Sequence, residues 1–413
     1  MAGKTKLLLV ACSQEETAKL TENIYRILKK DYGLEDQLEM LLGRRRNEID
    51  PELAKGYRSP LVMDFFPDAE VQVDIGRNDL KDIIRGKHVA LIEHLLTPDR
   101  KMFPTHPEYS QAVSINDHLM AVRGFLDVIS DVEQEILQRT LVVPYLTYVR
   151  SHSVEKYQGQ GFHQFNSLKR TIDDYSRGGV NAILAIDLHS DKAVQLAREK
   201  GMDFHNINPF KSGRSVNPYK LGLDEQKINE VLPRLRPYQE RLKKLAEDCK
   251  DNLYIVSVDA GTELRVENFA ERAFQECNVQ QVYAMVAYFD KSRISYDQSV
   301  MKFKPFSQIN EENVNPKGTY IIIDDMVASL RTAADVAKIL KEKGAKRVEV
   351  WTSHAVTMPF QHKAANDRTY IDNVVCLDTI PQHPQLNIEY IPASADLLAA
   401  ELYKVHQKLS AQQ

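Results

Sequence analysis

The chain is poor in cysteine. Only four occur in 413 residues, at Cys12, Cys249, Cys277 and Cys376, and they form no CxxC motif. Zinc clusters and the disulfide frameworks of small secreted proteins need closely and regularly spaced cysteines. The spacing therefore argues against both kinds of structure, and we expect the four residues to serve in packing.

The chain also lacks an excess of charge of one sign and a long apolar run. Its formal charge of −4 gives no electrostatic case for binding nucleic acid or an anionic membrane. The stretch MAGKTKLLLVACS lacks the apolar run of a signal peptide or membrane span. With 43% hydrophobic and 27% charged residues, we expect a soluble protein of two or more domains. Its expected location is the cytoplasm.

The sequence does contain many apolar runs of strand length, separated by amphipathic stretches. The runs are LLLVA, HVALIEH, TLVVPYL, AILAIDL, LYIVSV, VYAMVAYF, TYIIID, RVEVWTS and NVVCLD. Continuous apolar strands alternating with helices are typical of parallel sheets covered on both faces, so the predicted class is α/β. So many strands exceed one comfortable sheet, and a strand followed by an acid occurs in both IDLHS and IIIDDM. Two related halves are therefore predicted.

We place the domain boundary near residue 190. The expected parts are an N-terminal domain of residues 1–190, a C-terminal domain of residues 191–395 and a final helix at 396–413. The polar stretches at 43–58 and 211–250 are interpreted as insertions. Their basic runs are typical of solvated helix faces rather than of binding patches.

The first candidate site ends a strand in the segment AIDLHS. Asp187 and His189 stand at alternate positions, so both side chains are predicted to leave the same strand face. Carboxylate and imidazole can hold a divalent ion or orient a phosphate. The alternative is a histidine that is satisfied in a strand-to-helix turn.

Two further segments place polar residues at the end of a strand, the edge of a parallel sheet where ligands bind. In VSVDAGTELR, Asp259 precedes a glycine that could let the backbone approach a ligand, although aspartate is also a common helix cap. In AYFDKSRIS, Lys291 and Arg293 are predicted to project from a loop. Two such cations could neutralise a phosphoryl group in transfer, or they could simply be exposed.

The stretch IIIDDMVASLRTAADVAKIL has the layout of a sugar-phosphate site, with a strand, two carboxylates, a turn and a helix. Asp324 and Asp325 could accept hydrogen bonds from two ribose hydroxyls, or one of them could cap the helix. A turn that wraps a phosphate usually carries glycine and small hydroxyl residues, so that backbone N–H groups can close around the oxygens. The helix has one apolar face and is expected to stop at Gly344.

The order of these segments is more specific than any one of them. They run FFPDAEVQVDI, NDHLM, VVPYLTYVR, AIDLHS, VSVDAG, DKSR, IIIDDM, GAKRVEVWTSHAV and LDTIP. This is the serial motif order of the ribose-phosphate pyrophosphokinases, so the chain resembles a phosphoribosyl pyrophosphate (PRPP) synthetase from about Phe65 to its last helix. The resemblance implies two type I phosphoribosyltransferase-like domains, each a mainly parallel sheet flanked by helices.

The resemblance also implies the reaction and its participants. Members of this family transfer the β,γ-diphosphoryl group of Mg-ATP to the anomeric hydroxyl of ribose 5-phosphate and release AMP. The implied cofactor is Mg²⁺, with ATP as co-substrate, and the implied partners are small-molecule substrates. Further copies of the chain are expected too, as dimers assembled into hexamers, because subunits of this family share the ATP site.

Roles for single residues follow from the same resemblance. The residues implied to bind ATP are Phe66, Asp68 and Glu70, typically from a neighbouring subunit, with Arg150 and Ser151. Those implied to bind magnesium or its waters are His189 and Asp259, beside Asp187. The implied catalytic cations are Lys291 and Arg293, and the implied holders of the ribose hydroxyls are Asp324 and Asp325. The place of the 5-phosphate loop is taken by Ala328, Ser329, Leu330, Arg331 and Thr332.

This loop departs from the family pattern. The usual Asp-Thr-Gly-Gly-Thr is rewritten so that only Thr332 matches. Leu330 and Arg331 replace residues whose lack of bulk permits close approach, so a tightly wrapped phosphate monoester is not expected. A second departure follows Arg150, where the family's Arg-Gln-Asp is Arg-Ser-His and a basic cluster is replaced by VEKYQGQGFHQF.

Selective loss of the loop, with the transfer residues kept, favours an altered acceptor. We favour ADP-ribose, which would give ADP-ribose pyrophosphate, as in a divergent bacteriophage branch that rebuilds NAD from ADP-ribose and nicotinamide. The alternatives are an ordinary PRPP synthetase in which Arg331 contacts the phosphate, and a non-catalytic PRPP-synthetase-associated regulatory subunit. A simple phosphoribosyltransferase would need only one such domain.

Overall fold

The structure is a computed structural model of the chain. It describes residues 5–11, 15–42, 62–75, 79–98, 100–103, 108, 110–133, 135–150, 165–210, 217–249, 252–258, 262–277, 285–293, 299–303 and 312–413. Within 271–277, 285–293 and 299–303 only the backbone is described. The chain divides into two compact units, which are taken separately below.

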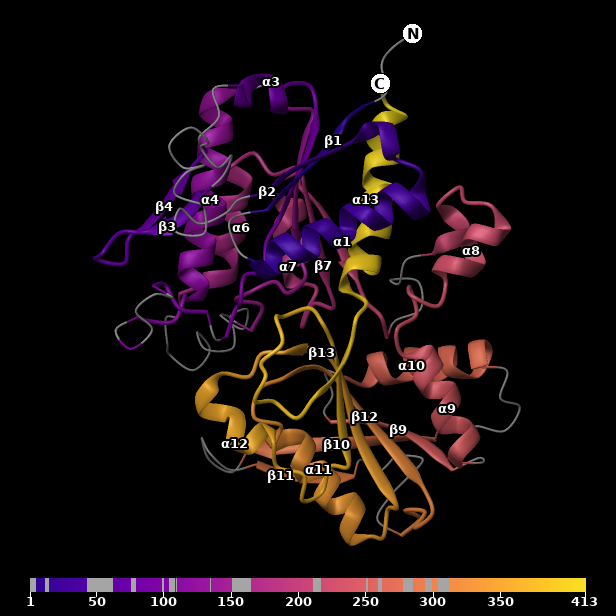
Figure 1. Cartoon of the computed structure of the whole chain (residues 1–413). Helices are drawn as coiled ribbons and strands as arrows, with labels where there is room; N and C mark the ends of the chain where they lie inside the picture. Colours follow the sequence, from indigo (N-terminus) through magenta and orange to yellow (C-terminus); the bar gives the residue numbers. More distant parts are fainter. Residues whose placement is uncertain are drawn as a thin grey trace. The chain divides into compact units, whose positions relative to one another are not determined.

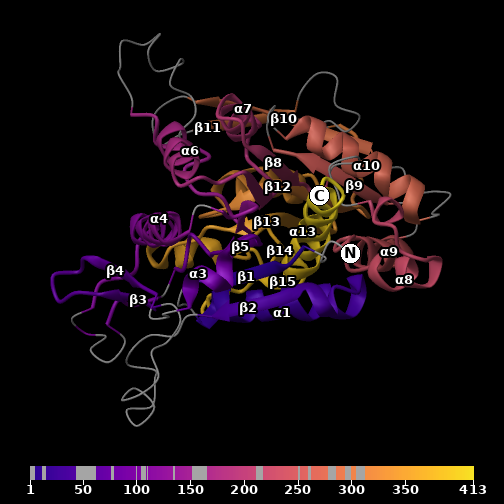
Figure 2. The ribbon, with the colours of Figure 1, turned by 90° about the horizontal axis from the view of Figure 1, so that it is seen from above.

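The first unit is built on a six-stranded sheet in the order β2-β1-β5-β6-β7-β8, with every neighbouring pair parallel. Its strands are β1 (Leu7–Ala11), β2 (Leu38–Leu42), β5 (His88–Ile92), β6 (Gln138–Val143), β7 (Ala182–Ile186) and β8 (Asp203–Ile207). Its helices are α1 (Glu15–Tyr32), α3 (Leu80–Ile84), α4 (Ile115–Val132), α6 (Ser167–Arg177), α7 (Lys192–Glu199) and α13 (Ser394–Ser410), with the short helix η1 (Glu35–Gln37). A separate hairpin of β3 (Val62–Phe65) and β4 (Val71–Asp74) lies beside α4 (Figures 1 and 2).

The second unit is built on a seven-stranded sheet in the order β11-β10-β9-β12-β13-β14-β15. Its strands are β9 (Leu253–Ser257), β10 (Met285–Arg293), β11 (Ser299–Phe303), β12 (Thr319–Val327), β13 (Arg347–Ala355), β14 (Asn373–Leu377) and β15 (Glu389–Ile391). The helices that follow are α9 (Gln239–Cys249), α10 (Glu263–Cys277), α11 (Arg331–Glu342) and α12 (His362–Ala365), with η4 (Pro359–Gln361). Upstream, η3 (Pro218–Lys220) and α8 (Glu225–Val231) lie in the stretch that the unit division crosses. Only β10 and β11 pair antiparallel among these strands, so the predicted α/β class is confirmed.

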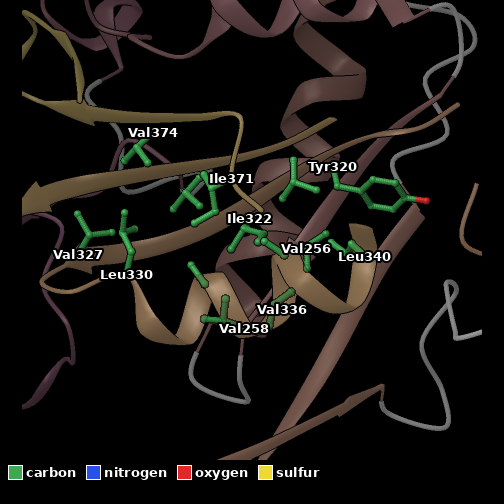
Figure 3. Packing of buried hydrophobic residues seen from close by; sticks show 14 of the residues in the cluster. Val256, Val258, Tyr320, Ile322, Val327, Leu330, Val336, Leu340, Ile371 and Val374 are labelled. Atoms are coloured by element: carbon green, nitrogen blue, oxygen red, sulfur yellow. The ribbon is translucent and has the colours of Figure 1, made fainter. Parts of the chain in front are cut away.

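Strand β12 is central in the second sheet, between β9 and β13. Its run from Tyr320 to Ile323 is fully buried, as a continuous apolar strand covered on both faces should be. Figure 3 shows Ile322 packed among Val256 of β9 and Val336 of α11, within one apolar cluster. This core fixes the strand whose carboxyl end carries the two carboxylates.

The expected domain boundary near residue 190 falls between β7 and β8. These two strands pair from Ala182↔Asp203 to Ile186↔Ile207, so one sheet contains both. The first compact unit accordingly runs to Ile207. It also includes the final helix, α13, which packs beside α1 (Figure 1).

The stretch 211–250 is not a simple polar insertion, because its second half enters the core of the second unit. The ring of Tyr238 stacks on Phe210 at 4.6 Å and on Trp351 at 5.5 Å between centroids. Its hydroxyl donates to the carbonyl of Thr352 at 2.7 Å. On α9, Leu242 is buried and Lys244 is exposed, as a solvated helix face predicts. Arg241 departs from that prediction, because it pairs with the buried carboxylate of Glu349 at 3.1 Å and lies over the ring of Trp351. The other polar stretch, 43–58, lies outside the described residues.

Two expectations from composition concern membranes and cysteine. Within the described part of the chain, no helix is long and apolar enough to cross a membrane. Cys376 is buried in the second core, as expected for a packing residue, and burial raises the pKa of its thiol. Cys249 donates to the hydroxyl of Thr319 at 3.0 Å.

A buried histidine pair ties α13 to the first sheet. The Nδ1 atoms of His88 and His406 lie 3.2 Å apart, so one ring donates and the other accepts, and both rings are neutral. Burial and the neighbouring ring lower the pKa of His88 to about 3, and burial lowers that of His406 to about 4. Because the unfolded chain binds protons on histidine below pH ~6.5, folding stability is full above that pH. It is lost as the pH falls from there toward 4.

We therefore predict that wild-type protein loses stability between pH 7.5 and 5.5, and that His406→Gln removes about 1 kcal/mol of that loss. Urea unfolding at the two pH values measures the difference in free energy. His189→Gln, which changes an exposed ring, should leave the loss unchanged. An unchanged pH dependence in His406→Gln would show that the pair is not the titrating element.

Candidate active site

The two adjacent carboxylates lie inside β12, not after it. Asp324 pairs with Thr352, and the ladder continues to Val327↔Ala355. The backbone N–H of Asp325 donates to Oδ1 of Asp324 at 2.9 Å. Asp325 is buried, whereas Asp324 is half-buried. The strand thus presents two acidic residues on successive positions at the carboxyl edge of the sheet, the edge where parallel sheets bind ligands.

Neither carboxylate caps the following helix, which corrects one of the two expectations for them. The N-cap residue of α11 is Leu330, and its side chain makes no capping hydrogen bond. Three residues separate β12 from α11, so the helix starts too far along the chain for Asp325 to be its N-cap. The other expectation, contact with ribose hydroxyls, remains a prediction.

The turn after β12 is held by the neighbouring strand end. Thr357 donates its hydroxyl proton to the carbonyl of Ala328 at 2.8 Å, and the backbone N–H of Val356 donates to Val327 at 2.9 Å. Thr357 is fully buried. The motif GAKRVEVWTSHAV lies just before this threonine, but sequence reasoning gave it no role. The signal in the sequence is a hydroxyl residue directly after this motif.

Leu330 adopts a left-handed backbone at the end of this turn, with φ 58° and ψ 5°. Outside glycine this region is costly, because Cβ approaches the carbonyl oxygen. The side chain is 5% exposed and belongs to the apolar cluster of the second core. Figure 3 shows it beside Val327, at the end of β12. The turn keeps a backbone that favours glycine, but a leucine occupies it and packs inward.

This placement corrects part of the expectation about bulk. The leucine was expected to obstruct close approach to the turn, yet its side chain is directed into the core. Arg331 differs, because it is exposed at the first residue of α11. Ala328, Ser329 and Thr332 are half-buried. Arg331 is therefore the residue of this turn whose side chain can obstruct a ligand or contact it.

The start of α11 has the character of an anion site. Its first intrahelical bond runs from the N–H of Ala334 to the carbonyl of Leu330 at 2.8 Å. The first N–H groups of a helix have no intrahelical acceptor, and the aligned peptide dipoles make this end positive. No acidic residue stands in the first turn to neutralise it. A phosphate placed here would meet backbone donors and the guanidinium of Arg331.

Asp187 and His189 do not share a strand face. Strand β7 ends at Ile186, and Asp187 has a left-handed φ of 45° that turns the chain away. The N–H of Asp187 donates to the carbonyl of Ile207 at 2.7 Å, and the side chain is buried. His189 is exposed. Within the described ranges no three metal-ligating side chains gather, and Asp259 lies outside them, so the magnesium assignment stays a prediction.

The residues expected to contact ATP are found in two places of the first unit. Phe66, Asp68 and Glu70 all lie in the turn between β3 and β4, closed by a bond from the N–H of Phe66 to the carbonyl of Glu70 at 2.9 Å. All three are exposed, and 45% of Phe66 is accessible, which is high for an aromatic ring. Arg150 is exposed at the end of the segment after β6, while Ser151 lies outside the described residues.

Lys291 and Arg293 lie within strand β10, not in a loop. Lys291 pairs with Met301 and Arg293 with Ser299 across an antiparallel hairpin with β11. The predicted strand VYAMVAYF is shorter than β10, because the prediction does not include the second strand of the hairpin, SVMKF. The hairpin carries both cations on a paired backbone.

Several known proteins are similar to this chain in sequence or in fold. The family model described as phosphoribosyl synthetase-associated domain matches residues 292–412. A ribose-phosphate pyrophosphokinase of Prochlorococcus marinus subsp. pastoris is 26% identical over 91% of this chain and 92% of its own length. That of Ralstonia nicotianae is 25% identical over 83% and 86%. The phosphoribosylpyrophosphate synthetase of Mycobacterium smegmatis shares the fold over 99% of this chain and 100% of its own, with TM-score 0.60 at 16% identity.

The left-handed backbone at Leu330 determines how substitutions there should change the free energy of unfolding. Leu330→Ala should lose about 3 kcal/mol of unfolding free energy, because it removes buried side-chain contacts and keeps the strain. Leu330→Gly loses the same contacts but relieves the left-handed strain, so it should be about 1 kcal/mol more stable than the alanine variant. Denaturant unfolding of both variants measures the order.

Leu340 provides a matched control on the same helix. It is fully buried in α11, where ordinary helical backbone makes glycine about 1 kcal/mol worse than alanine. The order of the two variants should therefore reverse between positions 340 and 330. Glycine worse than alanine at both positions would contradict the left-handed turn.

Proposed function

Since this chain belongs to the ribose-phosphate pyrophosphokinase family of enzymes, we propose that it transfers the β,γ-diphosphoryl group of ATP to the anomeric hydroxyl of a ribose 5-phosphate-type acceptor. The observation that carries the proposal is the end of β12, where two carboxylates, a turn and the uncapped start of a helix follow in order. These are the groups that a sugar diol and its phosphate require. The acceptor is proposed to bind here.

The reaction is an in-line displacement at the β-phosphorus. The 1-hydroxyl oxygen forms a bond to that phosphorus and loses its proton, while the bond from the phosphorus to the oxygen shared with the α-phosphate breaks. AMP leaves, and the acceptor carries the diphosphate. Little covalent chemistry falls to the protein, so alignment of two anions and neutralisation of charge are its main tasks.

We assign the charge neutralisation to Lys291 and Arg293 on the β10–β11 hairpin. Asp324 and Asp325 are assigned to the 2- and 3-hydroxyls of the acceptor. Phe66, Asp68 and Glu70 are exposed together at the tip of the β3–β4 hairpin. That exposure suits contact with ATP bound to another copy of the chain, in a homo-oligomer. Arg150 would lie against the nucleotide, where a planar guanidinium can stack.

Magnesium is the proposed cofactor, and it would shield the phosphate oxygens when bound. His189 and Asp259 are the residues assigned to it or to its waters. The exposure of His189 fits this assignment, because an imidazole that meets a solvated ion must reach solvent. Asp187, buried behind the same turn, is assigned to the shape of the turn as much as to the ion.

For the acceptor we propose ADP-ribose, with ADP-ribose pyrophosphate as product and a role in NAD resynthesis. Its 5-phosphate is a diester followed by a second phosphate, so the anion extends beyond the turn. Arg331 supports this choice, because it places an exposed cation at the start of α11 where the family pattern has glycine. A guanidinium there can pair with the second phosphate while backbone N–H groups meet the first.

Ribose 5-phosphate is the second candidate, and the inward packing of Leu330 favours it. The leucine leaves the turn unobstructed on the solvent side, and Ser329 and Thr332 still offer hydroxyls. A monoester could then be held with Arg331 as a direct contact. The two candidates differ in what Arg331 contributes.

AMP release from Mg-ATP with each acceptor, with mass spectrometry of the product, tests the proposal. ADP-ribose should be used with the higher kcat/KM. Arg331→Gln should lower kcat/KM for ADP-ribose about tenfold, the scale of one charge-assisted hydrogen bond, and lower that for ribose 5-phosphate much less.

Lys338→Gln is the matched control, because it removes another exposed cation from the same helix, two turns from Arg331. It should change neither value by more than about twofold. Preference for ribose 5-phosphate would establish the second candidate instead. If AMP is released with neither acceptor, the diphosphokinase assignment itself is wrong.

The cation assignment makes a separate kinetic prediction. Lys291→Ala should lower kcat at least about a hundredfold and change ATP affinity by less than about threefold, since the lysine acts on transition-state charge. Lys302→Ala serves as a control, because Lys302 stands on the partner strand opposite Asp290. Equal losses of turnover and of ATP affinity in Lys291→Ala would place the lysine in ground-state binding.

A further inference from the structure

A cavity lies between α4 and α6 in the first unit, apart from all residues assigned above. Its volume is about 240 Å³. A cavity of about 150 Å³ can hold a benzene ring, so this one has room for two fused rings. Figure 2 shows the two helices side by side. Most of the lining surface is apolar, and the apolar lining residues are Leu119, Met120, Leu126 and Phe165.

The rim is unusually apolar for a solvent-facing surface. Met120 is 51% exposed and Phe165 is 72% exposed, and both line the cavity. Tyr148 contributes another ring, which is held in place because its hydroxyl donates to Oδ1 of Asn116 at 2.5 Å. Aromatic and thioether side chains around an opening bind flat apolar rings well. The shape and the walls therefore suit a planar aromatic molecule.

Tyr175 lines the cavity through its ring only. The residue is 3% exposed, and its hydroxyl oxygen has almost no accessible surface, so a molecule in the cavity does not reach that oxygen. At Tyr175 the wall of the cavity is therefore an aromatic ring.

The exposed end carries a cation. Arg123 lines the cavity, is exposed, and pairs with no carboxylate in the part of the chain that the structure describes. The second arginine, Arg170, is instead paired with Asp174, at 3.3 Å. An anionic group on a ligand would therefore meet Arg123 at the rim.

We propose that this cavity binds a planar, two-ring aromatic acid, with its rings between α4 and α6 and its anionic group on Arg123. The chemistry of the site is independent of the proposed diphosphoryl transfer. It assigns a ligand class to residues that no part of the transfer reaction uses.

Isothermal titration calorimetry of the full chain with 2-naphthoate tests the proposal. We expect one site per chain, still present with saturating Mg-ATP. The matched probe is 2-naphthamide, which lacks the charge and should bind about tenfold more weakly.

Removal of the Arg123 cation should reproduce this loss. Arg123→Met should weaken the acid about tenfold and leave the amide unaffected, while Arg177→Met, an exposed arginine of α6 outside the cavity, should change neither. Met120→Trp, at a half-exposed position that tolerates bulk, should block the cavity.

Several results would overturn the proposal. One is the absence of any heat of binding with the probes. Another is an equal change of affinity in Arg123→Met and Arg177→Met, which would indicate nonspecific charge attraction. Displacement of the probe by ATP would assign the cavity to the nucleotide site. Binding unaffected by Met120→Trp would place the probe elsewhere.

Discussion

The left-handed backbone of Leu330, held by burial of its own side chain, is the constraint on which the proposed acceptor site depends. The conformation costs roughly 1–2 kcal/mol for a residue with a side chain. Burial of a leucine contributes more than that, about 2–5 kcal/mol as measured by truncation to alanine. The packing therefore outweighs the strain. As a result, α11 starts at a fixed point beyond the two carboxylates of β12, and its first N–H groups face a defined position.

This constraint separates the shape of the turn from its sequence. Glycine is the usual solution for a left-handed residue next to a phosphate, because it needs no space for a side chain. Here the side chain is accommodated inside the second core, and Thr357 holds the turn from the opposite side. The turn keeps its geometry because of these contacts. The side chain at the next position, Arg331, is exposed and can therefore contact a ligand. A ligand bound at this turn would therefore meet one exposed cation, Arg331, beside a backbone that usually requires glycine.

The sequence predicted most of the fold because the strands are continuous apolar runs, and β12 is an example with four successive residues fully buried. Motif order also predicted the family. Two predictions from local sequence were wrong. Lys291 and Arg293 were expected in a loop, but pairing with the distant strand β11 places them in β10. Asp187 and His189 were expected on one strand face, but the left-handed backbone at Asp187 ends that alternation. The direction of the Leu330 side chain was equally inaccessible, because a positive φ at a leucine has no sequence signature. The cavity between α4 and α6 was missed for a related reason, since its lining comes from two helices that no motif connects.

In the proposed site, backbone N–H groups at the start of α11 and the guanidinium of Arg331 hold the acceptor's phosphates, beside a diol bound by Asp324 and Asp325. A crystal structure of the protein with ADP-ribose and a non-hydrolysable ATP analogue would show these contacts. We expect the 5-phosphate within hydrogen-bond distance of the first-turn N–H groups of α11, and the second phosphate on Arg331. Acceptor phosphates away from this turn, with Arg331 in solvent, would rule out the proposed site.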